Sequence, residues 1–175
     1  MEWFVRTFVK ASLAWLAVGV TLGVAMAAHP PWVVYRPAHL HANVLGFVAM
    51  MIFGVAYHVI PRFSGHPLHS PTLARAHVWL ANAGLLAMVG GFALVAQGRR
   101  AGTLLLAAGG LASALGAYAF AYNLWRTIDG PARLREAARR AAAARQASGV
   151  TGRAPLPQAG ASAPPAAASA PLPRG

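Results

Sequence analysis

The hydrophobic positions of the chain gather into four long runs that no charged residue interrupts. These runs lie near residues 11–28, 40–60, 77–97 and 101–125. A helix needs about 20 apolar residues to cross the hydrocarbon core of a bilayer, and each run is long enough. Prolines, glycines and most of the remaining polar residues fall between the runs. The pattern predicts an all-α integral membrane protein in which residues 1–128 form a four-transmembrane-helix bundle.

The composition supports a membrane protein and narrows the chemistry. Of the 175 residues, 57% are hydrophobic and 10% are charged, and the mean hydropathy is +0.50. Soluble domains carry about 25% charged residues. The chain has no cysteine, which excludes disulfides, thiolate metal sites and covalent heme attachment through C-x-x-C-H. With only three acidic residues, paired-carboxylate catalysis is nearly excluded. No complete catalytic site is visible, so it is open whether the chain is an enzyme.

The basic residues are distributed unevenly between the two sides of the predicted bundle. The opposite loops hold Arg36, Arg99 and Arg100, whereas the other 12 of the 15 Lys and Arg residues fall on the side of the two termini. An excess of Lys and Arg marks the cytoplasmic side, so both termini are predicted to be cytoplasmic. The net charge of +12 thus reflects topology, and no motif for nucleic-acid binding accompanies it. A second interpretation of residues 1–27 is a cleavable signal peptide.

The composition changes after the fourth run. Residues 129–147 are rich in arginine and alanine and predict a basic cytoplasmic helix along the anionic inner leaflet. Residues 148–175 consist mainly of Ala, Pro, Gly and Ser, a composition typical of disordered segments. We therefore expect a helical extension followed by a disordered C-terminal tail.

Seven histidines are the only titratable groups present in number near pH 7. His41 and His58 stand near opposite ends of the second run, and their separation of 17 positions corresponds to about 25 Å of helix. One heme cannot use both side chains, so two separate sites are considered. His66 and His69 lie in a Gly-His-Pro loop and are read as ordinary loop residues.

At the predicted inner end, His58 precedes the end of the second run and His77 opens the third. Antiparallel helices would bring the two side chains to one depth. Gly54 and Gly84 share their helix faces and predict a flat void for a porphyrin, whose propionates Arg62 could neutralise. The alternative is that both histidines are interfacial polar residues without a cofactor.

At the predicted outer end, His39 and His41 open the second run. Residues two apart on a helix point to nearly opposite faces, so only one should face the bundle, and the deeper His41 is expected to do so. Its partner could be His29, His39 or a residue of a second protomer. The predicted metal ligands are His41, His58 and His77.

The segment RPAHLHANVLGFVAMMIFGVAYHVIPR, residues 36–62, resembles the second transmembrane helix of heme–copper oxidase subunit I. The cytochrome-c oxidases of the cbb type and the related nitric oxide reductases are the most similar members. The segment YNLWRTI, residues 122–128, also resembles helix ends in that family. A full subunit I has many more helices than the four predicted here. The helices that would carry the copper site and the second low-spin heme ligand are missing, so the resemblance implies no oxygen- or NO-reducing site in this chain.

In that family an arginine and a histidine open this helix at the outer face, and the histidine is an axial ligand of the low-spin heme b. The Arg-Pro-x-His part of the pattern matches Arg36, Pro37 and His39, whereas the His-x-Asn part matches His41 and Asn43. The resemblance therefore implies His39 or His41 as the ligand, and it places the protein in the bacterial cytoplasmic (inner) membrane.

The leading hypothesis is a small membrane protein that binds one or two b-type hemes for electron transfer or for gas or redox sensing. The predicted cofactor-binding residues are Arg36, His39, His41, His58, Arg62 and His77. A second hypothesis is a cofactor-free structural or assembly subunit of a respiratory oxidase. A third is a copper or zinc site at the outer histidines, since imidazole suits either metal. Short HxH-bearing membrane proteins of the nitric oxide response also resemble the second run. The expected partners are the lipid bilayer, a larger respiratory complex or a second copy of the chain.

Overall fold

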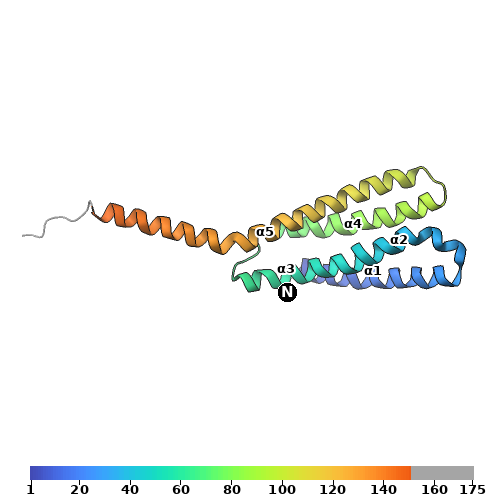
Figure 1. Ribbon diagram of the computed structural model, residues 1–175, viewed down its shortest axis with the longest axis horizontal. Helices are drawn as coiled ribbons and strands as arrows, with labels where there is room; N and C mark the ends of the chain where they lie inside the picture. The colour runs from blue at the N-terminus through green and yellow to red at the C-terminus, as the bar shows by residue number, and fades with distance from the viewer. Residues whose placement is uncertain (151–175) are drawn as a thin grey trace, which may run out of the picture. The chain divides into compact units, whose positions relative to one another are not determined.

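The described part of the chain is almost entirely helical. The computed structural model describes residues 1–150, and no strand occurs among them. In chain order the elements are α1 (Trp3–Ala28), η1 (Pro30–Tyr35), α2 (Arg36–His41), η2 (Ala42–Ala49), α3 (Met50–Ser64), α4 (Pro71–Ala96) and α5 (Ala101–Val150). Figure 1 shows long helices that run back and forth, joined by short connections.

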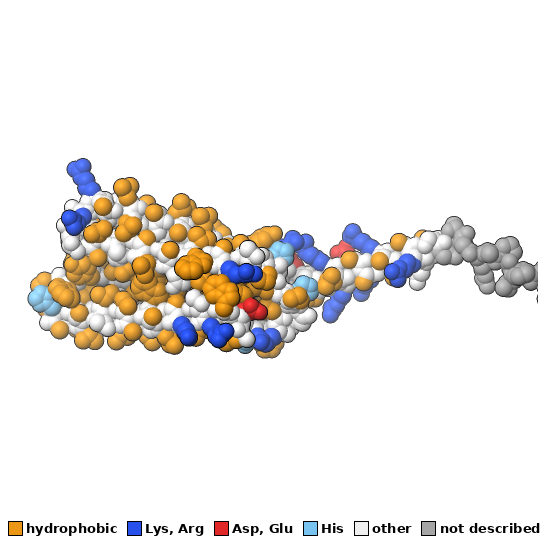
Figure 2. Space-filling model, turned by 180° about the vertical axis from the view of Figure 1, so that it is seen from behind, with side chains coloured by type: hydrophobic (Ala, Val, Ile, Leu, Met, Phe, Trp, Pro, Cys, Tyr) orange, Lys and Arg blue, Asp and Glu red, His pale blue; other side chains and the backbone are white. Residues whose placement is uncertain are grey.

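Four helical segments are long and apolar enough to cross a membrane. They are Trp3–Ala28, Pro30–Ser64, Pro71–Ala96 and Ala101–Ser148. Many large hydrophobic side chains on these helices are exposed, among them Leu104 at 76%, and Figure 2 shows hydrophobic side chains over most of the visible face of the bundle. Contiguous apolar surface of this extent fits lipid contact rather than water. The predicted fold class, an all-α membrane bundle, is confirmed.

The chain divides into two compact units. The first is Met1–Glu136, which holds the whole of α1 to α4, and the second begins at Ala137. α5 begins in the first unit and continues to Val150, with Pro131 inside the helix. The division at residues 128 and 147 remains a prediction. Residues 151–175, most of the segment expected to be disordered, lie outside the described residues.

The second membrane span is not one regular helix. It starts with the 3₁₀-helix η1, continues through the short α2 into the π-helix η2, and ends as α3. π-helical segments are rare and usually short, and they are frequent at functional sites. The hydrophobic pattern predicts a regular α-helix near 40–60 and does not indicate η2. The span is apolar on all its faces, so a change in helical winding leaves the pattern unchanged.

Glycines allow close contact between neighbouring helices. A Cβ atom on Gly46 of η2 would lie 2.6 Å from Trp15 Cβ of α1. A Cβ on Gly84 of α4 would lie 2.9 Å from the carbonyl oxygen of Gly109 in α5. Small residues at such positions let helices associate in lipid, where the hydrophobic effect does not drive them together. These contacts fix the faces on which the histidines lie.

Candidate functional site

The histidines lie in two groups at opposite ends of the membrane-spanning helices. The first group, which we call the His41 end, contains His29, His39 and His41, where α1 ends and the second span starts. The second group, the His77 end, contains His58, His66, His69 and His77, from the end of α3 to the start of α4. The two ends differ in how far each imidazole is enclosed.

His77 is fully buried, with 0% of its side chain exposed. Its ring centroid lies 4.8 Å from that of Phe8, 4.6 Å from Phe53 and 5.5 Å from Phe120. The hydroxyl of Tyr57 lies 3.1 Å from His77 Nδ1. Residues from α1, α3 and α5 thus surround an imidazole carried by α4.

The space beside this imidazole is small. His77 Nε2 is the only buried side-chain nitrogen or oxygen of the described residues that has no hydrogen-bond partner, and His77 lines a cavity of about 60 Å³. Pockets for ligands of drug or cofactor size measure about 300–1,000 Å³. A heme therefore does not fit beside His77 in this arrangement.

Neighbouring helices fill the void that the glycines were expected to leave. A Cβ on Gly54 would lie 3.1 Å from Phe8 Cβ of α1, and one on Gly84 would lie 2.6 Å from Ser113 Oγ of α5. These glycines serve helix–helix contact because α1 and α5 pack directly on them. The space beside Gly54 and Gly84 is therefore occupied by α1 and α5.

His58 is bound to the arginine that was expected to face heme propionates. Arg62 Nη1 lies 2.8 Å from His58 Nδ1 and 2.7 Å from the His58 carbonyl oxygen. A guanidinium can only donate hydrogen bonds, so Nδ1 accepts and the ring proton resides on Nε2. A metal at Nε2 would require a different protonation of this ring, so the predicted His58–His77 ligand pair finds no support in the geometry.

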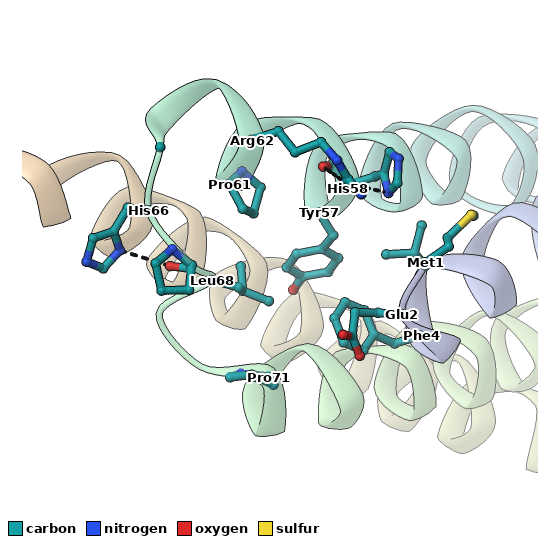
Figure 3. A pocket seen from close by; sticks show the side chains of 13 residues that line it. Met1, Glu2, Phe4, Tyr57, His58, Pro61, Arg62, His66, Leu68 and Pro71 are labelled. Carbon is teal, nitrogen blue, oxygen red and sulfur yellow. Dashed lines mark hydrogen bonds between the residues drawn. The ribbon is translucent and has the colours of Figure 1, made fainter.

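An open pocket of about 610 Å³ lies beside His58, between the start of α1, the end of α3 and the loop before α4. Figure 3 shows His58 and Arg62 side by side on α3, whereas Tyr57 points to the other side, toward Phe4. The polar residues of its lining are Glu2, Tyr57, His58, Arg62 and His66, and the other lining residues are apolar or glycine. It opens on the side of the helix ends.

At the other end, His39 packs between two helices. Its Nδ1 lies 2.8 Å from the carbonyl oxygen of Gly19 in α1, and a Cβ on Gly23 would lie 3.0 Å from its Cε1. Asn43 Nδ2 donates to the His39 carbonyl oxygen at 2.9 Å. His39 therefore joins the second span to α1, in the notch that the Gly19–Gly23 pair leaves open.

His41 points to a different helix and is only partly covered. Its Nδ1 lies 2.8 Å from the carbonyl oxygen of Pro37, one turn earlier in α2, and its ring contacts Phe92 of α4 at 4.7 Å. A carbonyl can only accept, so Nδ1 is protonated and Nε2 carries a lone pair. The side chain is half-buried, and Arg36 lies exposed at the start of the same helix.

The remaining histidines make local contacts. His29 is exposed and meets the Trp32 ring edge-on at 5.7 Å. His66 Nδ1 lies 2.9 Å from the Pro67 carbonyl oxygen, and the ring of His69 lies 5.8 Å from that of Tyr122. No group of three or more His, Cys, Asp or Glu side chains suited to a metal occurs in residues 1–150. Residues 1–150 thus offer single imidazoles rather than a metal cluster.

Two polar residues that the sequence analysis did not single out fix the loop before α4. Asn123 accepts from Ser70 N at 2.9 Å and donates to Ser70 O at 2.8 Å. Thr127 Oγ1 accepts from His69 N at 3.0 Å. Both residues belong to the YNLWRTI segment. Two polar side chains near the end of an apolar run were the one feature of the sequence that could have indicated this contact.

Comparison with known proteins gives one distant relationship. No protein-family model matches the chain. The sequence is 28% identical to the cbb3-type cytochrome c oxidase subunit CcoN1 of Stutzerimonas stutzeri, and the match covers 60% of this chain and 27% of that subunit. The chain thus spans about a quarter of this curated relative. The similarity gives distant support to the predicted resemblance to oxidase subunit I.

Proposed function

We propose that the chain is a membrane module similar to the first helices of an oxidase subunit I, and that it contributes one axial imidazole, His41, to a b-type heme. The module would serve electron transfer or gas or redox sensing within a larger respiratory complex. The observation that carries this proposal is the hydrogen bond from His41 Nδ1 to the Pro37 carbonyl oxygen at 2.8 Å. Distant similarity to an oxidase subunit supports the choice of cofactor.

The surroundings of His41 suit an axial ligand. Histidines that bind metals usually donate their other ring N–H to a carbonyl or carboxylate, which fixes the tautomer and the ring orientation. His41 has this bond within its own helix. Its half-buried ring lies at the surface of the bundle, so a heme could approach Nε2 without displacing the core.

His39 is less suited to the same role. Its ring already fills the notch at Gly23 and bonds across to α1. Moving it would cost helix packing as well as a hydrogen bond. We therefore assign His39 to positioning α2 and His41 to the iron.

The rest of the site would come from outside one chain. Arg36, exposed in the first turn of α2, would pair with a propionate carboxylate. A second iron ligand would come from another subunit or from a second copy of the chain. Iron bound by imidazole supplies one-electron redox chemistry, with a potential tuned by the ligand and by burial.

The test is a reduced-minus-oxidised optical spectrum of the tagged full chain, purified in a mild detergent with whatever remains bound. We expect a Soret band and sharp visible bands for the wild type. His41→Ala should lose them, and the matched variant His58→Ala should retain them. Loss in His58→Ala with retention in His41→Ala would contradict the assignment.

Absence of heme from the wild type would overturn the proposal and favour a cofactor-free structural subunit. The sealed packing around His77 favours this second candidate, because it gives that histidine a structural role. Metal analysis of the same sample tests for copper or zinc.

We also propose that both termini face the cytoplasm of a bacterial cell, as the bias of Lys and Arg toward that side supports. The chain has no native cysteine, so single cysteines can be introduced without background. Cysteines at Glu2 and at Gln97 should react on opposite sides of the membrane with an impermeant maleimide. Labelling of both from the same side would contradict the topology.

A further inference from the structure

A small, partly open cavity lies between η2, α3, α4 and α5. Its walls include Phe53 of α3, His77 and Leu85 of α4, and Ser113 and Ala117 of α5. The lining is mostly apolar, and His77 and Ser113 are the two lining residues whose side chains carry a nitrogen or oxygen atom. The cavity is separate from His41 and plays no part in the proposed heme site.

The imidazole at this cavity has one nitrogen without a partner. Tyr57 Oη lies 3.1 Å from Nδ1, whereas Nε2 is buried and has no partner among the described residues. Phe8, Phe53 and Phe120 pack around the His77 ring, and their side chains offer Nε2 no hydrogen-bond partner. Buried polar atoms are nearly always hydrogen-bonded, by protein or by ordered water.

The hydroxyl of Ser113, the second polar group at the cavity, has only a weak hydrogen-bond partner. Ser113 Oγ lies 3.7 Å from Met88 Sδ, and a thioether sulfur is a weak acceptor. Serine hydroxyls inside helices usually bond to a carbonyl one turn earlier or point to a better partner. The hydroxyl is thus free to turn toward a ligand in the cavity.

We propose that this cavity is a binding site for one or two water molecules, held between His77 Nε2 and Ser113 Oγ. A buried water needs about 10–15 Å³ of space and two to four polar partners, and the cavity of about 60 Å³ provides room and two partners. The site takes a small neutral hydrogen-bonding molecule, since the apolar walls offer nothing to balance an ion.

The proposal holds for either tautomer of His77. If Tyr57 donates to Nδ1, then Nε2 carries the proton and a water oxygen accepts it. If Nδ1 donates to Tyr57, then Nε2 has a lone pair and a water donates to it. Tyr57 also lines the open pocket at the helix ends (Figure 3). The water thus extends a hydrogen-bonded chain from that pocket through Tyr57 and His77 to Ser113.

The experiment is water-edited solid-state NMR of the full chain in liposomes, with ¹⁵N-labelled histidine and the His77 ring assigned through its backbone. We expect polarisation to pass from water to His77 Nε2. Ala117→Val adds two methyl groups to the cavity wall and should abolish this transfer. Ala114→Val is the matched control, because Ala114 lies on the same helix, is exposed and does not line the cavity.

Each outcome decides the proposal. No transfer to Nε2 in the wild type, or full transfer retained in Ala117→Val, overturns it and leaves a dry apolar cavity. Loss in Ala117→Val with retention in Ala114→Val supports it. Ser113→Ala, which keeps the cavity and removes one partner, should weaken the transfer, and an unchanged signal there would remove Ser113 from the site. An unchanged position of the His41 resonances in each variant verifies that the fold is intact.

Discussion

At the His77 end, an imidazole is enclosed by aromatic rings from three helices and by a tyrosine hydroxyl, and it has 0% exposure. At the His41 end, an imidazole bonds only to its own helix and lies half-exposed beside Phe92. The two residues are chemically identical, and both stand near the end of a membrane-spanning segment. Enclosure makes the first a part of the core, whereas an uncovered ring nitrogen leaves the second available to a ligand.

The largest effect on stability should come from replacing His77 with alanine. The change deletes a fully buried ring and leaves a cavity, so we expect the free energy of unfolding to fall by about 3 kcal/mol, as for other large-to-small core changes. His41→Ala is the matched variant and should stay within about 0.5 kcal/mol, as for most surface changes. Equilibrium unfolding in mixed micelles, followed by tryptophan fluorescence, measures both. Equal losses would remove the distinction between the two ends.

The second largest effect on stability is expected in the loop before α4, at the His77 end. Asn123→Ala removes both hydrogen bonds to the Ser70 backbone at the His77 end, and groups left unsatisfied cost about 1–3 kcal/mol. We expect a loss of about 2 kcal/mol in the same assay. Gln97→Ala, at an exposed position in the turn between α4 and α5, is the control and should change little. A comparable loss for Gln97→Ala would show that Asn123 has no special role.

The hydroxyl of Tyr57 should contribute less than the ring of His77. Tyr57→Phe keeps the aromatic packing and removes the bond to Nδ1. Hydrogen bonds between membrane helices contribute about 0.6 kcal/mol on average and up to about 1.7 kcal/mol. We expect a loss within that range. Tyr118→Phe, at a residue 74% exposed, should be neutral, and a loss there equal to that of Tyr57→Phe would point to a general effect of tyrosine.

The smallest change in stability is expected at the His41 end, for Gly23→Ala. A Cβ there would lie 3.0 Å from His39 Cε1, so the imidazole must shift. Alanine gains about 1 kcal/mol over glycine in helix propensity, which offsets the crowding. We expect a near-zero change in the free energy of unfolding and a clear change in the NMR chemical shifts of the His39 ring. Gly110→Ala is the control, because no atom lies within 4 Å of a Cβ at that position, and it should leave the His39 shifts unchanged. Unchanged His39 shifts in Gly23→Ala would contradict the contact between Gly23 and His39.

The helices could be predicted from the sequence because a bilayer imposes a length, and four apolar runs meet it. The sequence does not predict which side of each helix packs against its neighbours. A helix that is apolar on all sides has no polar stripe to show which side faces inward. Phe53 and Phe120 come from two such runs and Phe8 precedes the first run. No periodicity in the sequence therefore indicates that the three rings converge on His77. The small residues Gly54 and Gly84 were visible, but small residues suit a cofactor and a neighbouring helix equally well.

The spacing of the outer histidines predicts that they lie on different faces of the helix, but the expectation that only His41 faces the bundle is not met, because both rings contact a neighbouring helix. Two residues apart on a helix, His39 and His41 contact different helices, α1 and α4. Which of them could bind iron depends on the hydrogen-bond partner of each Nδ1. These partners are backbone carbonyl oxygens, and the sequence alone does not show which carbonyl a side chain contacts. The role of either residue as a heme ligand remains a prediction.

The π-helix η2 lies between the two ends and sets their relative orientation. Its hydrogen bonds close over one residue more than those of an α-helix, and each residue of an α-helix turns the chain by about 100°. Winding Ala42–Ala49 as a regular α-helix, with no residue removed, would therefore turn Tyr57 away from His77, while His39 kept its contact with α1. The one surplus residue in η2 thus determines which neighbouring helix each half of the second span contacts.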